Sequence, residues 1–114
     1  MNAMATGYAN DLRRVRALGI DASDISRVTG AARATVSSWM RATRRPGAAH
    51  RERLLELVAI VDRLVDVMDE DYVAIWLQKP LPALNDDTPL DALSDGRYRS
   101  VSELVAELED DSFS

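Results

Sequence analysis

Apolar residues recur along this chain at intervals of three and four, the spacing that places them on one side of an α-helix. In the first segment Leu12, Val15 and Leu18 share one side, and Gly19 then favours a helix end. No segment shows the sustained alternation of a strand. The pattern therefore predicts an all-α fold, with helices over residues 8 to 18, 22 to 29, about 33 to 43, 54 to 68, 71 to 78, 88 to 93 and roughly 98 to 109.

Residue types that begin and end helices support these limits. Asp21 and Ser23 are both suited to capping the start of the second helix. Thr88 followed by Pro89 is typical of a helix start, because the hydroxyl accepts a bond from a free backbone N–H and proline is tolerated at the first position. The stretch from 79 to 87 is too rich in proline for a helix or strand and predicts a loop.

The central helix carries more apolar residues than one face can hold. Positions 54, 55, 57, 58, 60, 61, 64, 65, 67 and 68 are all apolar. A helix with so wide an apolar surface packs on two sides. Two interpretations stay open: one side faces a second copy of the chain, as a dimer interface, or a single chain covers the whole helix.

Charge divides the chain into two unlike parts. The 114 residues are 46% hydrophobic, enough for the core of one modest domain, and carry a formal net charge of -5. Residues 1 to 53 hold 10 Lys and Arg against 4 Asp and Glu, whereas residues 54 to 114 hold 4 against 15. This asymmetry indicates a basic surface suited to a polyanion and an acidic surface suited to a different partner.

The basic part has the spacing of a helix-turn-helix. Ile25, Gly30, Val36 and Trp39 stand where that motif needs an inward residue, a turn and two locking residues. This register turns the third helix outward through Arg33, Thr35, Ser37, Ser38 and Arg41, with Arg44 and Arg45 just beyond it. Hydroxyls and arginines of this kind contact phosphates and guanine edges, so we predict DNA binding, by a dimer if the binding is specific.

A second interpretation is that the same segment is an ordinary solvated helix with Trp39 in the core. Spacings of this kind do arise by chance in helical proteins. The agreement between spacing and local charge favours the DNA-binding interpretation.

Residues 72 to 108 resemble the C-terminal toxin-binding domain of the Xre/MbcA/ParS family of antitoxins. The resemblance rests on Trp76 and Leu77, then Pro80, Pro82, Ala83 and Leu84, then Thr88, Pro89, Leu90, Asp91 and Leu93, with Gly96 before the last helix. The helix-turn-helix before it sits where that family has its own. The chain departs from the family at Leu81, where asparagine is common, and at residues 85 to 87, which replace a glycine-rich segment.

The resemblance implies a fold with an N-terminal helix-turn-helix domain (residues 1 to 53), a central helix (54 to 68) and a toxin-binding domain with a C-terminal tail (69 to 114). It implies a dimeric antitoxin that binds its own operator DNA and neutralises a RES-domain toxin that degrades NAD. In such relatives the C-terminal end obstructs the toxin's active site. The candidate toxin-binding residues here are Asp110, Asp111, Ser112, Phe113 and Ser114, with Tyr98 and Arg99 as further candidates.

Two other interpretations compete with the antitoxin: a stand-alone dimeric repressor, and a scaffold module whose arginines only solubilise it. For the tail, the alternative is an acidic chain end that is solvated and frayed.

The sequence offers little for catalysis. It has no cysteine, and its one histidine, His50, lies in an arginine-rich stretch that predicts a plain surface residue. The aspartates from 86 to 95 lack the ligand spacing of a calcium loop, and no glycine-rich phosphate loop occurs. We therefore expect no enzyme activity, cofactor, metal or small-molecule substrate. The absence of a long apolar run and of a signal-peptide core predicts a cytoplasmic protein without membrane contact.

Overall fold

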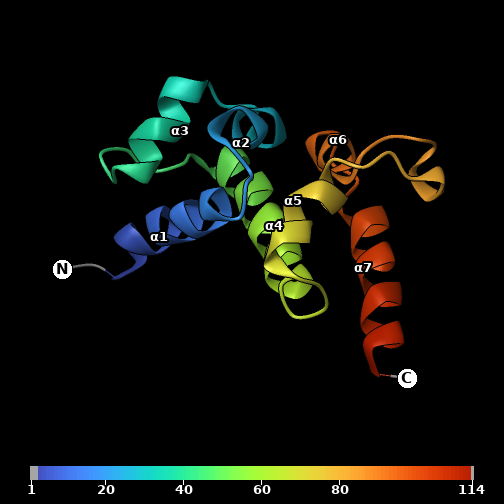
Figure 1. Ribbon diagram of the computed structural model, residues 1–114. Coiled ribbons are helices and arrows are strands. Elements are labelled where there is room, and N and C mark those ends of the chain that lie inside the picture. Colours follow the sequence, from blue (N-terminus) through green and yellow to red (C-terminus); the bar gives the residue numbers. More distant parts are fainter. Residues whose placement is uncertain (1–2, 114) are drawn as a thin grey trace.

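The computed structural model describes the backbone of residues 3 to 113 and the side chains of residues 7 to 111 (Figure 1). Its helices are α1 (Ala3–Ala17), α2 (Ala22–Thr29), α3 (Arg33–Met40), α4 (Ala48–Leu64), α5 (Glu70–Leu77), α6 (Pro89–Ser94) and α7 (Tyr98–Phe113), with one 3₁₀ turn, η1 (Pro82–Leu84). These residues contain no strand, which confirms the predicted all-α class.

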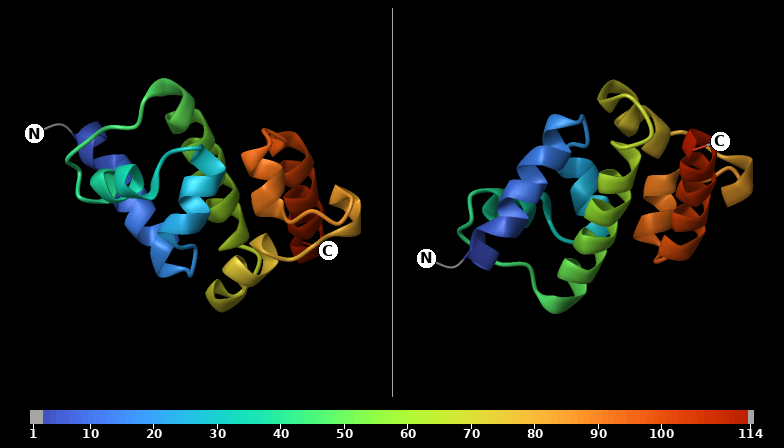
Figure 2. Two further views of the ribbon diagram at one scale, coloured as in Figure 1. Left: turned by 90° about the horizontal axis from the view of Figure 1, so that it is seen from above. Right: turned by 90° about the horizontal axis from the view of Figure 1, so that it is seen from below.

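Helix α4 forms the middle of the molecule. Helices α1 to α3 lie on one side of it and α6 and α7 on the other (Figure 2). The molecule is elongated, with extents of 43 × 26 × 22 Å. The two ends of the chain lie far apart, the first helix on one side and the last on the other (Figure 1).

Local capping explains the limits of α2. The N–H of Asp24 donates to Asp21 Oδ1 at 2.9 Å, and the N–H of Asp21 donates back to Asp24 Oδ2 at 3.3 Å. This reciprocal box satisfies free donors at the start of the helix, so the cap predicted at Asp21 is confirmed. At the other end Gly30 adopts a left-handed φ of 81°, which ends α2 and turns the chain toward α3.

Helix α3 ends at Met40, three residues before its predicted end. Ala42 has a left-handed φ of 59°, and the N–H of Thr43 donates to the Ser38 carbonyl at 3.0 Å. This hydrogen bond is typical of a Schellman motif, in which the residue with the left-handed conformation is usually glycine. The prediction was wrong because Ala42 gives no sequence signal for a helix stop.

Helix α4 begins and ends earlier than the predicted 54 to 68, at Ala48 and Leu64. Its inward residues, all buried, are Leu54, Leu57, Val58, Ile60, Val61 and Leu64. Contacts with α1, α2, α6 and α7 cover them. A single chain therefore covers most of the wide apolar surface, while Leu55 stays 54% exposed.

In the acidic half, two local features follow from residue type. The Thr88 hydroxyl accepts from the N–H of Asp91 at 3.1 Å, and Pro89 takes the first position of α6, as predicted. In the loop before it, Asn85 and Asp86 have left-handed φ values of 57° and 68°. Asn and Asp tolerate this region better than other non-glycine residues, which explains how they stand in a segment that is glycine-rich in the resembling family.

The two halves share one hydrophobic core. Buried residues of α1, α2 and α3 join those of α4 to α7 in one continuous cluster. Polar contacts also cross between the halves: Arg27 pairs with Asp91 at 3.2 Å, and the Gln78 amide donates to Asp24 at 3.4 Å. The basic and acidic surfaces are therefore carried by one packed unit.

Candidate functional site

The outer face of α3 brings together most of the residues predicted to contact DNA. Val36 and Trp39 are buried, so they fix the helix against the core, as predicted. Arg33 and Arg41 are exposed at its two ends. Ala34, which the sequence interpretation did not select, is exposed between them, and its small side chain leaves the helix surface low enough for close approach to a groove.

The three hydroxyl residues of α3 are less outward than predicted. Thr35, Ser37 and Ser38 are half-buried. The Ser38 hydroxyl donates to the Ala34 carbonyl at 3.1 Å, which leaves its oxygen lone pairs to accept. The three hydroxyl side chains lie along the sides of the outer face of α3, and Arg33 and Arg41 lie at its two ends.

The loop after α3 adds Arg44 and Arg45, both exposed. The Tyr8 hydroxyl of α1 donates to the Arg44 carbonyl at 2.7 Å, which ties this loop to the first helix. The side chains of Arg44 and Arg45 extend the basic face beyond the end of α3.

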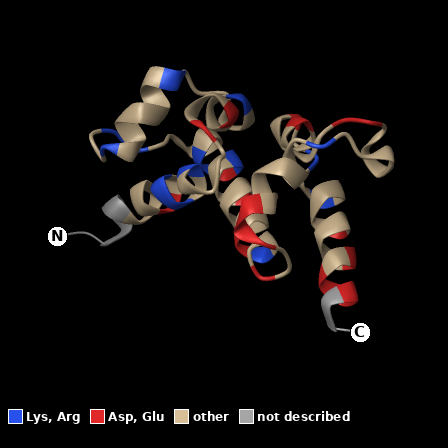
Figure 3. Cartoon of the chain, in the orientation of Figure 1, with Lys and Arg blue, Asp and Glu red and all other residues tan. Residues whose placement is uncertain are grey.

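Figure 3 shows where the charged residues lie along the chain. Arginines of both halves form ion pairs, among them Arg14, Arg27 and Arg53 in the basic half. In the acidic half, Arg63, Arg97 and Arg99 each pair with a carboxylate. Within the described part of the chain, no ion pair involves Arg13, Arg16, Arg41, Arg44 or Arg45. The basic face thus keeps its charge for an external anion.

His50 is not the plain surface residue that the sequence suggested. It lies in the first turn of α4, half-buried, with Nδ1 2.8 Å from the carbonyl oxygen of Thr29. Its ring also lies against that of Trp39, with centroids 5.8 Å apart. His50 therefore connects the end of α2 with α3 and α4, a structural role inside the helix-turn-helix.

On the opposite side of the molecule, Arg63 anchors α7 to α4. Its Nη2 donates to Glu109 Oε1 at 2.6 Å and its Nε to Glu109 Oε2 at 3.1 Å, a bidentate pair. Its Nη1 donates to the Ser102 hydroxyl at 2.7 Å. The guanidinium holds the pKa of Glu109 below its ordinary value, through the hydrogen bonds first and through its charge as well.

The acidic tail continues α7 instead of leaving the helix. The helix was predicted to end near 109 and extends to Phe113, with Asp110 and Asp111 exposed. The last turn contains no lysine or arginine. Acids at the negative end of a helix dipole are unfavourable, and the last turn therefore carries charge that its own residues do not offset. The predicted contacts at Ser112, Phe113 and Ser114 lie outside the residues whose side chains are described.

The two weaker candidates differ in their surroundings. Tyr98 is half-buried and packs against the core, so it helps to close the start of α7 on the rest of the protein. Arg99 is 93% exposed and pairs with Glu103 one turn along at 3.3 Å. Of the two, only Arg99 presents most of its side chain to a partner.

The described residues lack the features of two other kinds of site. No group of three or more His, Cys, Asp or Glu side chains lies close enough together to hold a metal ion. No helix in the same range is long and apolar enough to cross a membrane.

Comparison with known proteins gives matches along nearly the whole chain, although no family model matches it. Three curated proteins, from Mycobacterium bovis and two strains of Mycobacterium tuberculosis, carry the name mycobacterial cidal antitoxin MbcA. Each is 26% identical over 105 residues, which is 92% of this chain and 90% of the relative. A chain in the crystal structure of the M. tuberculosis MbcT–MbcA toxin–antitoxin complex has the same fold, with a TM-score of 0.81, 24% identity and 96% of each chain covered.

Proposed function

This chain is a homologue of the MbcA-type antitoxins, and we propose on that basis that it is the antitoxin of a type II toxin–antitoxin pair. The observation that carries the proposal is the extent of the match, which includes both the basic and the acidic parts of the chain. The structure supports it by placing α1 to α3, from the basic part, and α6 and α7, from the acidic part, on opposite sides of α4 (Figure 2).

The proposed partner is a RES-domain toxin that degrades NAD, as the resemblance in residues 72 to 108 implies. A cleft that binds the pyrophosphate of NAD carries cationic groups. The end of α7 offers Asp110 and Asp111, both exposed, to such a cleft. The tail thus neutralises the toxin by occupying its active site, and both proteins act in the cytoplasm.

The proposed second activity is autoregulation through operator DNA. The α3 face supplies Arg33 and Arg41 at the groove, and the loop supplies Arg44 and Arg45 to the backbone. A single unit on one half-site binds too weakly for specificity, so a homodimer is part of the proposal. Leu55 on the exposed side of α4 is an apolar residue that such a dimer would cover.

Co-expression with the RES-domain protein encoded beside this chain tests the proposal. We expect the two to co-purify, and we expect the Arg33→Ala, Arg41→Ala double variant to co-purify equally well because both residues lie on the other side of α4. A toxin that elutes alone in the presence of folded wild-type protein would contradict the antitoxin role. In that outcome, retained operator binding would favour the stand-alone repressor.

A further inference from the structure

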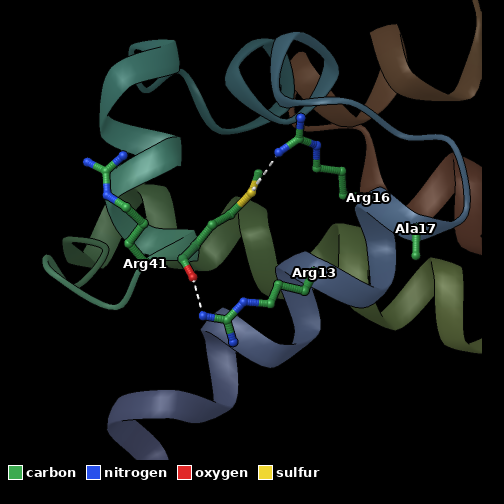
Figure 4. A pocket seen from close by; sticks show the side chains of 5 residues that line it. Arg13, Arg16, Ala17 and Arg41 are labelled. Carbon is green, nitrogen blue, oxygen red and sulfur yellow. Dashed lines mark hydrogen bonds between the residues drawn. The ribbon is translucent and has the colours of Figure 1, made fainter.

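A hollow of about 470 Å³ lies between α1 and the end of α3 (Figure 4). Its lining consists of Arg13, Arg16, Ala17, Met40 and Arg41. Three of these five residues are arginines: Arg13 and Arg16 belong to α1, and Arg41 follows the last residue of α3. The hollow is therefore a concentration of positive charge that the tertiary fold creates.

Neutral groups hold two of these arginines in place. Arg13 donates from Nη2 to the Met40 carbonyl at 2.5 Å and from Nη1 to Asn10 Oδ1 at 3.1 Å. Arg16 donates from Nη1 to the thioether sulfur of Met40 at 3.7 Å. These partners orient the guanidinium groups without cancelling their charge, and each guanidinium keeps further N–H groups that can donate to a ligand.

The neighbouring arginine shows the opposite arrangement. Arg14 lies between the two in sequence but faces away from the hollow, where it pairs with Asp11 and Asp62. Hydrogen bonds to Asp62 above all raise its pKa above the ordinary value. One helix therefore carries a neutralised arginine on one side and two oriented, unneutralised arginines on the other.

The hollow also adjoins the proposed DNA surface. Arg41 belongs to both, because it ends α3 and lines the hollow (Figure 4). Ala17 contributes only a methyl group, so the hollow stays open to a bulky anion. A planar guanidinium fork matches the oxygens of a phosphate, and the C-terminal half of a DNA-reading helix passes close to the backbone.

We propose that this hollow binds a phosphodiester group of the DNA backbone, with Arg13 and Arg16 as its ligands beside Arg41. The inference rests on the proposed operator binding and extends that surface from α3 to α1. Arg13 and Arg16 set the orientation of the protein on the duplex and carry no base specificity.

The salt dependence of DNA binding tests this assignment. The Arg13→Gln, Arg16→Gln double variant is compared with wild type by fluorescence anisotropy on a labelled duplex from upstream of its own gene. Losing two phosphate contacts lowers the slope of log K against log salt by about 1.8, so that between 50 and 200 mM salt the variant loses about tenfold less affinity than wild type. The matched control is Arg14→Gln, which removes an arginine of the same helix and is expected to leave the slope unchanged.

Three outcomes would overturn the assignment. Equal slopes for the double variant and a binding-competent wild type would exclude the hollow while leaving operator binding intact. An equal loss of slope in Arg14→Gln would show a general charge effect. Saturation of wild type by inorganic phosphate alone in the sub-millimolar range, followed by NMR shifts of Arg13 and Arg16, would assign a small-molecule site instead.

One further outcome and one replacement variant complete the test. A wild type that does not bind the duplex at all would contradict the proposed operator binding itself, which is a different failure. Should the double variant melt early because Arg13 supports the Met40 carbonyl, the single Arg16→Gln variant replaces it. Among the described residues, the Arg16 side chain donates only to the Met40 sulfur. The single variant is expected to lower the slope by about 0.9.

Discussion

Ala42 occupies a backbone conformation that glycine adopts more easily. Its φ of 59° ends α3 and starts the loop that carries Arg44 and Arg45. A left-handed conformation costs an L-residue about 1 to 2 kcal/mol. Glycine avoids this cost, but its greater freedom in the unfolded chain offsets part of the stability that it would add. The conformation of Ala42 therefore lowers the stability of the folded protein at the edge of its proposed DNA surface.

The Ala42→Gly variant is expected to raise the free energy of unfolding by about 0.5 to 1 kcal/mol, because glycine removes the steric cost. Urea unfolding followed by circular dichroism measures the change. The matched control is Ala34→Gly, the same chemical change inside α3, which is expected to lower stability by about 1 kcal/mol. A loss of stability in both variants would show that Ala42 is not strained.

For single residues, the sequence predicted the role of those whose hydrogen-bond partners are close in the chain. Asp21 and Thr88 cap helices through N–H groups three residues away, so residue type and position were enough. His50 contacts a carbonyl 21 residues away, and Arg13 one 27 residues away. Such contacts depend on how helices pack, which periodicity along one helix does not determine.

Among the elements, α7 extends beyond its predicted end and is joined to α4 by a contact between residues far apart in sequence. Its apolar seam predicted an end near 109, but the bidentate pair between Arg63 and Glu109 joins its last part to α4. These residues lie 46 positions apart in sequence, so no local sequence pattern predicts the ion pair. The existence and order of the helices followed from the 3.6-residue period, whereas the start of α1, both ends of α4 and the last residues of α3 and α7 did not.

The Glu109→Gln variant is expected to loosen the end of α7, because the amide cannot replace a charged bidentate partner of Arg63. Hydrogen exchange at neutral pH should become several-fold faster in residues 103 to 111 and stay unchanged in α2. The Glu107→Gln variant, at an exposed position on the same helix, serves as control. Equal exchange in all three proteins would show that the pair does not anchor α7.

The same pair predicts a pH dependence of known sign. The folded protein holds the pKa of Glu109 below its ordinary value. The stabilisation is therefore fully present above the unfolded pKa of about 4.3 and is lost as the pH falls through the lower folded pKa. Wild-type α7 should approach the exchange rates of Glu109→Gln only below that range.

For the whole molecule, the central structural fact is one core beneath two oppositely charged surfaces. Charge segregation along the sequence predicted the two surfaces. It did not predict that the halves share buried residues across α2, α4 and α6, because composition carries no information about packing between helices. A domain pair with separate cores would have shown the same charges.

The shared core predicts a single unfolding transition. Trp39 reports on the helix-turn-helix and Trp76 on the acidic half, and both are buried. In Trp39→Phe and in Trp76→Phe, the fluorescence of the remaining tryptophan should follow the same denaturant curve as the circular dichroism of that variant. Fluorescence that changes well before the helical signal in either variant would show that the halves unfold separately.

We propose that this chain neutralises a toxin through the end of α7. The most direct measurement is the rate of NAD loss caused by the proposed RES-domain partner while either the full chain or residues 1 to 109 is added. We predict that the full chain stops NAD loss and that the shortened chain needs about tenfold or more protein for the same effect. Continued NAD loss at saturating full-length chain would contradict the antitoxin function, and equal potency of the two chains would contradict the role of the tail.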